Sequence, residues 1–450
     1  MKDLRKMFGT DGIRGIANRD LTAELSCKVG RAAARFLAKG KRSKIVVGRD
    51  PRPSGDMLVK SLIAGILSEG VDVLDAGIVP TPTVAMLTQI LKAQGGIVIS
   101  ASHNPLEDNG IKLLSEGGKK LSDKQESLVE GFILEKDVEP DRLPVGNDLG
   151  RYILLDDANK LYIDYLMKMF ELDLKGIKIV LDCANGASSI LAPLVLKLLG
   201  AEVMSFNTDI SGESINKGCG STHPEVISRL VTENEGDIGF SYDGDGDRVI
   251  AADSKGRILD GDYIIAFCAC RLKNNGSLKN NSVVTTIMAN MGLDKLLEEE
   301  GIMLEKTAVG DRYVLERMKA TGSVLGGEQS GHIIFSDISS TGDGIISTLE
   351  FLNSIIDTGH GFDNIFDILK KYPQIIKNIK VADKKGLLSD KDLLEKIGEV
   401  EKSLGSEGRV VVRPSGTEPL VRIMVEASSK EKANATVAKI YDIILRHESN

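Results

Sequence analysis

The sequence has no tryptophan, and aromatic residues make up only 4% of its 450 positions. Its core must therefore be built mainly from Ile, Leu, Val and Ala. No uninterrupted apolar segment is long enough to span a bilayer, so the sequence predicts no transmembrane helix. Basic tracts are also missing, and the formal net charge is -8. Nucleic acid and membranes are therefore not expected as partners.

Cysteine is scarce, and the five cysteines are scattered along the chain. Only Cys268 and Cys270 lie close together, inside a stretch that we expect to form an apolar helix. Neither a zinc-binding spacing nor a disulfide framework results, which favours a reducing compartment. The segment Met1–Lys6 is charged and lacks the apolar core of a signal peptide. We therefore expect a cytoplasmic protein.

The length and the 42% hydrophobic content predict roughly three or four domains rather than one core. One order of elements occurs three times: strand, loop, helix, glycine, strand. The copies start at the apolar runs 44–48, 178–181 and 282–287. This repetition predicts three similar mixed α/β domains with largely parallel sheets.

The C-terminal part follows another pattern. Apolar runs at 408–413 and 420–426 flank a polar turn, and a helical pattern covers 430–446. This order is typical of a smaller α+β domain with an antiparallel hairpin, preceded by a linker near 370–374. The expected domains are 1–153, 154–254, 255–369 and 370–450.

The stretch Ser100–Pro105 directly follows the expected buried strand Gly95–Ile99. Ser102 thus lies where a strand ends, and its hydroxyl could be held rigidly and still be exposed. An ordinary turn is the alternative, because Ser, Asn and Pro are common turn residues.

Asp243, Asp245 and Asp247 place three carboxylates within five residues, separated by glycines. Without a cation they would repel one another and raise each other's pKa, so the cluster favours a hard divalent metal. An EF-hand would need Gly where Arg248 stands and Glu where Ser254 stands. A solvated acidic turn remains the alternative. Three protein ligands would leave Mg²⁺ open positions for phosphate oxygen or water.

Two further loops carry groups that suit a sugar phosphate. Arg413–Pro419, with Arg422 just beyond, supplies guanidinium, hydroxyl and backbone N–H groups, as a phosphate-binding loop does. In Gly326–His332, an extended backbone would point Glu328 and Ser330 the same way, toward neighbouring sugar hydroxyls. Ordinary hairpin turns are the alternative for both.

Three glycine-containing stretches present cations. Phe8–Gly15 has three glycines and places Arg14 on an expected loop. Lys112 and Arg312 each follow a glycine closely, in Asn109–Lys112 and Val309–Arg312. Taken alone, such cations are usually solvated.

These motifs, in this order, resemble those of the α-D-phosphohexomutase superfamily from about Lys6 to about Arg446. The stretches 8–15, 309–318 and 327–332 are similar to its phosphoglucosamine branch in particular. The resemblance implies three α/β domains and a smaller fourth domain around a central cleft, with the fourth domain closing over the substrate.

The resemblance also implies roles for matching residues. Ser102 would carry the transferable phosphoryl group as phosphoserine, and Asp243, Asp245 and Asp247 would hold one Mg²⁺ together with it. Glu328 and Ser330 would bind sugar hydroxyls. The phosphate that does not react would be bound by Arg413, Ser415, Gly416, Thr417 and Arg422. The reacting end would be lined by Arg14, His103, Lys112 and Arg248, with His103 or Lys112 as general acid/base.

The implied activity is that of an isomerase that interconverts glucosamine 6-phosphate and glucosamine 1-phosphate for amino-sugar and cell-envelope precursor synthesis. Glucosamine 1,6-bisphosphate or glucose 1,6-bisphosphate would be intermediate or activator. The expected partners are sugar phosphates, and a homodimer of the chain stays open. Three alternatives stay open: a phosphoglucomutase or phosphomannomutase, a non-catalytic sugar-phosphate-binding protein, and a metal-dependent phosphatase.

Overall fold

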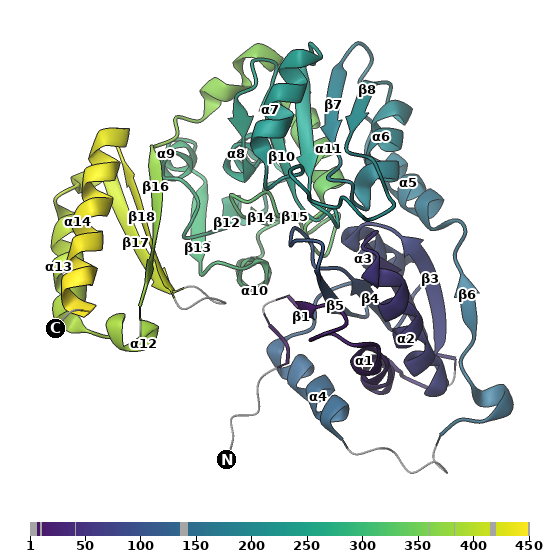
Figure 1. The fold of residues 1–450 in the computed structure, drawn as a ribbon. Coiled ribbons are helices and arrows are strands. Elements are labelled where there is room, and N and C mark those ends of the chain that lie inside the picture. The colour runs from purple at the N-terminus through teal and green to yellow at the C-terminus, as the bar shows by residue number, and fades with distance from the viewer. Residues whose placement is uncertain are drawn as a thin grey trace. The chain divides into compact units, whose positions relative to one another are not determined.

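The computed structural model describes residues 7–9, 11–40, 42–135, 143–359, 361–381, 383–414 and 420–448. The chain divides into two compact units, one of residues up to Thr286 with Glu305–Ile368, the other of Ile287–Leu304 with residues from Leu369 onward (Figure 1). Across the described ranges, no helix has both the length and the hydropathy to cross a lipid bilayer. All five cysteines are described, and each is a free thiol.

The first unit begins with a six-stranded sheet in the order β1-β5-β4-β2-β3-β6. Strands β4, β2, β3 and β6 run parallel to one another, whereas β5 is antiparallel to both β4 and β1. The strands are β1 (Ile13–Ile16), β2 (Lys44–Arg49), β3 (Asp72–Ile78), β4 (Gly95–Ile99), β5 (Asp108–Ser115) and β6 (Tyr152–Leu154). The accompanying helices are α1 (Ala23–Leu37), α2 (Ser54–Ser68), α3 (Thr81–Ile90) and α4 (Asp123–Leu134).

Helices cover both faces of this sheet because its strands are apolar on both sides. Ile45 and Val47 of β2 belong to one buried cluster with Val29 of α1 and Leu62 of α2. On the other face, glycines of β2 and β4 leave room for Val84 of α3. Figure 1 shows α1 and α2 side by side. The parallel strands therefore all end at one edge of a layer that is covered on both faces at β2 and β4 and exposed at the edge strand β6.

A second sheet of the same unit has the order β11-β10-β9-β7-β8. Its strands are β7 (Lys178–Asp182), β8 (Glu202–Phe206), β9 (Ile238–Tyr242), β10 (Val249–Asp253) and β11 (Ile258–Leu259). Strand β7 is parallel to β8 and β9, and β10 is antiparallel to β9 and β11. The neighbouring helices are α5 (Ala158–Met169), α6 (Ser188–Leu198), α7 (Pro224–Glu233) and α8 (Gly261–Asn274). Ile227 and Val231 of α7 pack against Val180 and Ala252 of the sheet.

The third sheet has the order β13-β12-β14-β15. Its strands are β12 (Ser282–Thr286), β13 (Met303–Thr307), β14 (Leu325–Gly327) and β15 (Ile333–Phe335). The helices along this part of the chain are α9 (Met291–Glu299), α10 (Asp311–Thr321) and α11 (Gly344–Thr358). Val314 and Met318 of α10 pack on Val284 and Ile334, which fixes α10 against the sheet.

The second unit contains an antiparallel three-stranded sheet in the order β16-β18-β17. Its strands and helices are β16 (Gln374–Lys380), α12 (Lys384–Leu387), α13 (Lys391–Lys402), β17 (Gly408–Pro414), β18 (Leu420–Ala427) and α14 (Lys430–Glu448). Val421 and Ile423 share a buried cluster with Ile397 of α13 and Ile440 of α14. The predicted hairpin followed by a helix is confirmed, although the expected linker already ends where β16 begins.

The threefold recurrence that the sequence predicts is present as β2-α2-β3, β7-α6-β8 and β12-α9-β13. Each copy has a glycine in the left-handed region before its second strand, with φ of 76° at Gly70, 97° at Gly200 and 62° at Gly301. Side chains disfavour this conformation, which explains the recurring glycine. The fold class expected from the sequence, three mixed α/β parts and an α+β part, is confirmed.

Candidate active site

Ser102 lies in the loop after β4 and has a left-handed backbone, with φ 53°. Its Oγ donates a hydrogen bond to Asp243 Oδ2 at 2.5 Å and lies 3.2 Å from His103 Nδ1. Residues other than glycine rarely adopt this conformation, and it is common at functional sites. The expectation of an exposed hydroxyl is wrong, because Asp243 covers it and Ser102 is 2% exposed.

The backbone around Ser102 is held by a buried ion pair below it. Arg52 donates to Asp50 Oδ2 at 3.0 Å and, through Nη2, to the carbonyls of Ser102 at 3.0 Å and Asn104 at 2.7 Å. Ser100 Oγ donates to Asp50 Oδ2 at 2.6 Å and accepts the N–H of Ser102 at 2.8 Å. Both Asp50 and Arg52 are at most 1% exposed. Hydrogen bonds at both the N–H and the carbonyl of Ser102 therefore stabilise its unusual conformation.

Asp243, Asp245 and Asp247 converge in the loop between β9 and β10, as the sequence predicts, and oxygens of all three lie within 4.8 Å of one another. Each is at most 4% exposed. Burial, followed by the charges of Asp247 and Asp245, raises the pKa of Asp243 well above its ordinary value. In the described part of the chain, Asp245 Oδ1 and Asp247 Oδ1 are buried without a hydrogen-bond donor. Buried carboxylate oxygens without donors are the groups that a divalent cation binds, so this set fits a metal ion.

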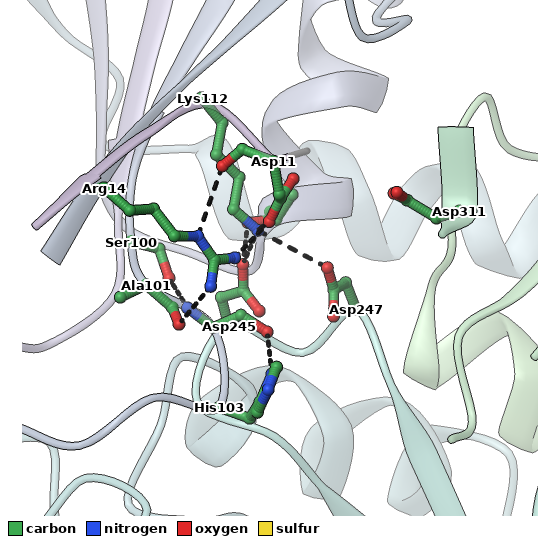
Figure 2. Close-up of polar contacts among 12 residues, drawn as sticks. Asp11, Arg14, Ser100, Ala101, His103, Lys112, Asp245, Asp247 and Asp311 are labelled. Atoms are coloured by element: carbon green, nitrogen blue, oxygen red, sulfur yellow. Dashed lines mark hydrogen bonds and ion pairs between the residues drawn. The ribbon is translucent and has the colours of Figure 1, made fainter. Parts of the chain in front are cut away.

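Lys112 enters this cluster from β5. Its Nζ lies 2.7 Å from Asp245 Oδ2, 3.1 Å from Asp11 Oδ2 and 3.6 Å from Asp247 Oδ2. Figure 2 draws these residues. Burial would lower the pKa of Lys112, but the three carboxylates raise it well above its ordinary value. The alternative of a solvated surface cation is wrong, because the residue is 1% exposed.

Arg14 lies in strand β1, so the expectation that it stands on a loop is wrong. The pairing of β1 with β5 opposes Arg14 to Gly110. The Arg14 guanidinium pairs with Asp11 and lies 3.4 Å from the carbonyl of Ala101 (Figure 2). Arg14 is thereby placed beside the Ser102 loop.

His103 and Arg248 lie on two loops that meet at Ser102. Burial, followed by the charges of Arg248 and Arg14, lowers the pKa of His103 to about 4. The backbone N–H of Arg248 donates to Asp243 Oδ1 at 3.2 Å, and its Nε lies 3.9 Å from Asp247 Oδ1. Arg248 therefore adds a positive charge beside the three carboxylates, whereas a pKa of about 4 leaves His103 neutral near pH 7.

Glu328 and Ser330 lie in the turn between β14 and β15, closed by a hydrogen bond from the Gly331 N–H to the Glu328 carbonyl at 3.0 Å. The expectation of extended backbone at this point is therefore wrong, and the spacing of Glu328 and Ser330 does not align their side chains. Glu328 is 8% exposed and accepts the Gly310 N–H at 3.1 Å, whereas Ser330 is exposed. The Glu328 side chain is therefore buried, whereas the Ser330 side chain faces solvent.

Four charged residues that sequence reasoning did not assign to the site also lie here. Lys120 contacts the carboxylates of Asp11 and Asp311. His332 lies 3.6 Å from Asp311 Oδ2 through Nε2 and 3.6 Å from Asp247 Oδ2 through Nδ1. The glycine-containing stretches described above include three of them, Asp11, Asp311 and His332. Their position inside these stretches could have assigned them to the site. Lys120 lies in none of these stretches.

Arg413 and Arg422 belong to the second unit and are opposite each other in the register of β17 and β18. Ser415, Gly416 and Thr417, predicted to bind phosphate with them, lie outside the described residues. Within this unit the two arginines therefore occupy paired positions near the end of the β17–β18 hairpin.

Profiles of the phosphoglucomutase/phosphomannomutase family match residues 5–139 (alpha/beta/alpha domain I), 160–256 (domain II), 260–372 (domain III) and 376–443 (C-terminal domain). A phosphoglucosamine mutase of Caldanaerobacter subterraneus subsp. tengcongensis is 48% identical, covering 98% of this chain and 99% of that protein.

Solved structures share the fold. A phosphoglucomutase/phosphomannomutase family protein of Burkholderia thailandensis matches with a TM-score of 0.80 and 26% identity, covering 98% of this chain and 96% of that one. Aspergillus fumigatus N-acetylphosphoglucosamine mutase, in complex with GlcNAc-6P and magnesium, matches with a TM-score of 0.72 and 18% identity, covering 98% and 96%. With matches over nearly its whole length, the chain belongs to the phosphoglucomutase/phosphomannomutase family, in which its relatives at 48% identity are phosphoglucosamine mutases.

Proposed function

We propose that this chain interconverts glucosamine 6-phosphate and glucosamine 1-phosphate through a phosphoserine at Ser102 and a 1,6-bisphosphate intermediate. The observation that carries the proposal is the contact of Ser102 Oγ with Asp243, inside a buried set of three carboxylates of which two oxygens lack donors. The names of the relatives at 48% identity support glucosamine phosphate as the sugar.

Asp243, Asp245 and Asp247 would hold one Mg²⁺ together with the Ser102 phosphoryl group. When bound, the ion would neutralise charge on the transferring phosphoryl group. The buried Oδ1 atoms of Asp245 and Asp247, which lack hydrogen-bond donors, support this assignment. The structure of Aspergillus fumigatus N-acetylphosphoglucosamine mutase is a complex with magnesium. Lys112 would keep two of the carboxylates in place through its contacts with Asp245 and Asp247.

Phosphoryl transfer needs alignment and charge neutralisation more than covalent assistance. In the first half-reaction, the bond between phosphorus and Ser102 Oγ breaks while a bond to the free sugar hydroxyl forms, and that hydroxyl loses its proton. The other phosphate of the bisphosphate then returns to Ser102. Arg14 and Arg248 lie beside the loop and would neutralise the phosphoryl oxygens.

The proton needs an acceptor within hydrogen-bond distance of the reacting oxygens. His103 Nδ1 lies 3.2 Å from Ser102 Oγ, whereas Lys112 Nζ is engaged by three carboxylates. Of the two residues that the sequence suggests, we therefore assign the general acid/base role to His103 and the role of a fixed cation to Lys112.

The remaining contacts would orient the sugar. Glu328 and Ser330 would bind sugar hydroxyls, and the phosphate that does not react would be bound by Arg413, Ser415, Gly416, Thr417 and Arg422. Arg413 and Arg422 are opposite each other on β17 and β18, so one phosphate could accept hydrogen bonds from both guanidinium groups. The phosphate site must accept either end of the sugar, because the bisphosphate turns around between the two steps.

The proposal keeps the four-part division 1–153, 154–254, 255–369 and 370–450 and places the reaction in the cytoplasm. It includes glucosamine 1,6-bisphosphate or glucose 1,6-bisphosphate as activator. A homodimer is also proposed, and sedimentation of the purified chain would measure it.

A coupled assay that compares glucosamine, glucose and mannose 1-phosphates tests the proposal. We expect the highest kcat/KM for the glucosamine ester, activation by glucose 1,6-bisphosphate, and loss of turnover in Ser102→Ala. At least tenfold faster turnover of the glucose or mannose ester would instead identify a phosphoglucomutase or phosphomannomutase. Net phosphate release without dependence on bisphosphate would identify a phosphatase, and unchanged biological activity of Ser102→Ala would identify a binding protein.

A further inference from the structure

Six charged side chains of the first unit form a closed ring in which the sign of the charge alternates. Each contact is an ion pair or a close approach between oppositely charged groups, with histidine counted as cationic when protonated. In order around the ring they are Lys112, Asp11, Lys120, Asp311, His332 and Asp247. The ring therefore connects the metal-binding loop with the start of α10 by two routes.

Lys120 carries the route that does not pass through His332. Its side chain is 11% exposed and contacts both Asp11 and Asp311, which are 300 positions apart in the chain. Burial would lower the pKa of Lys120, but Asp11 and Asp311 raise it. Burial and the charge of Asp11 act to raise the pKa of Asp311, but Lys120 and His332 lower it overall. Both carboxylates contact Lys120, so they lie close enough to repel each other. The ammonium group of Lys120 lies between them and attracts both carboxylates, which holds Asp11 and Asp311 together.

The segment that Lys120 holds is the start of α10. Asp311 is its first residue, and the preceding Gly310 donates its N–H to Glu328 Oε1 at 3.1 Å. The next residue, Arg312, pairs with Asp123 and, at 2.7 Å, with Glu126 of α4. The start of α10 is thus attached to the first sheet and α4 at two successive side chains.

A cavity of about 250 Å³ opens beside this segment. Its lining consists of Phe8, Gly9, Asp123, Gly310, Asp311, Arg312 and Tyr313. A displacement of residues 310–312 would therefore change a cavity wall and, through Gly310, the position of the Glu328 carboxylate.

We propose that Lys120 is a positioning residue that fixes residues 309–312 and, through Gly310, the sugar-binding Glu328. The part concerning Glu328 rests on the proposed function. Without Lys120, Asp11 and Asp311 repel each other and the start of α10 moves away from the first sheet. Lys120 then affects how tightly the sugar is bound rather than the transfer of the phosphoryl group at Ser102.

The neighbouring Lys119 offers a matched control, because its side chain is exposed and the described residues give it no ion pair. Three variants are compared with the wild type: Lys120→Met, Lys120→Arg and Lys119→Met. The first measurement is hydrogen–deuterium exchange over residues 309–318, which needs no turnover. The second is steady-state kinetics with glucosamine 6-phosphate, and the third is the midpoint of the Mg²⁺ titration followed by thermal unfolding.

We expect Lys120→Met to exchange faster over 309–318 and to raise KM about tenfold while kcat falls less than about threefold, because misplacing a binding group weakens substrate binding. Lys120→Arg should restore both properties substantially, and Lys119→Met should leave them unchanged. The Mg²⁺ midpoint should shift less than about twofold, since Lys112 still holds Asp245 and Asp247.

Unchanged exchange over 309–318 in Lys120→Met would overturn the proposal, as would a fall in kcat with KM unaltered. Faster exchange in Lys120→Met, together with a wild type that turns over none of the three sugar phosphates, would support the link through Lys120 and refute the proposed function. Equal effects of Lys119→Met and Lys120→Met would show a general charge effect and also overturn the positioning role.

Discussion

The Oγ of Ser102 lies 2.5 Å from Oδ2 of Asp243, although 141 positions separate the two residues. One comes from the loop after β4 and the other from the loop after β9, so the contact joins two sheets. Burial and two neighbouring carboxylates raise the pKa of Asp243. Ser102, the proposed phosphoryl carrier, therefore lies directly against the group that would share a metal ion with its phosphoryl form.

Removing this hydroxyl should abolish turnover without unfolding the protein. We expect Ser102→Ala to lose at least about three orders of magnitude in kcat, because no other group can carry the phosphoryl group between the half-reactions. Intact mass spectrometry after incubation with glucose 1,6-bisphosphate should show one added phosphoryl group in the wild type and none in the variant. Ser127→Ala, at an exposed position of α4, serves as the control. Phosphorylation of the Ser102→Ala variant would contradict this assignment.

Magnesium should stabilise the folded protein through Asp243, Asp245 and Asp247. A ligand at 100 times its Kd adds about 2.7 kcal/mol, so the thermal unfolding midpoint should rise with Mg²⁺ and fall back after chelation. Asp247→Asn should lose most of this response, because it removes one charged ligand. Asp164→Asn, which changes an exposed carboxylate paired with Lys160 on α5, should respond as the wild type does. Equal responses in the two variants would place the ion elsewhere.

The parts of the site that the sequence predicts are those that short stretches determine. Three aspartates separated by single glycines converge whatever the position of their loop in the fold. Ser102 follows an apolar strand whose end can be located from the sequence. Both predictions need only local geometry. The hairpin that carries Arg413 and Arg422 was predictable for the same reason.

The residues that the sequence left unassigned depend on long-range packing. Arg52 and Lys120 act on groups supplied by other segments, and no local pattern shows what a long side chain will reach. The two errors of backbone geometry have another cause. Pairing with β5 makes a strand of the segment around Arg14, and the short β14–β15 hairpin bends the backbone at Glu328 into a turn. Long-range strand pairing overrode the local expectation at Arg14, and a local hairpin did so at Glu328.

Helices α1 and α2 approach so closely that glycine is required at their contact. A Cβ on Gly30 would lie 2.2 Å from the Leu62 carbonyl oxygen, a backbone atom that cannot easily move. We therefore expect Gly30→Ala to lower the free energy of unfolding by about 3 kcal/mol or more. Gly131→Ala in α4 is the matched control, because a Cβ there meets nothing within 4 Å and alanine favours the helix by about 1 kcal/mol. Urea denaturation of both variants measures the difference, and a neutral Gly30→Ala would refute the close packing.

Asp343 caps helix α11 in a fully buried position. Its Oδ1 accepts the N–H groups of Ile345 at 2.9 Å and Ile346 at 3.0 Å, and Oδ2 accepts the Tyr162 hydroxyl hydrogen at 2.7 Å. Burial nevertheless raises the pKa of Asp343 from 3.8 to about 6. The folded state therefore binds the carboxyl proton of Asp343 more tightly than the unfolded state. The stabilisation that this proton gives the folded state is fully present below about pH 4 and is lost as the pH rises through about 6.

Asparagine caps helices as well as aspartate and carries no charge to desolvate, so Asp343→Asn should keep that stabilisation at higher pH. A pKa difference of this size corresponds to at most about 3 kcal/mol, and we expect Asp343→Asn to exceed the wild type in unfolding free energy by about 1–3 kcal/mol at pH 7.5. The advantage should shrink as the pH falls toward 4. Chemical denaturation at pH 4.5, 6 and 7.5 measures it, with Asp390→Asn at the cap of α13 as the control. An advantage independent of pH, or a loss at pH 7.5, would show that the Asp343 carboxylate is stabilised as an anion.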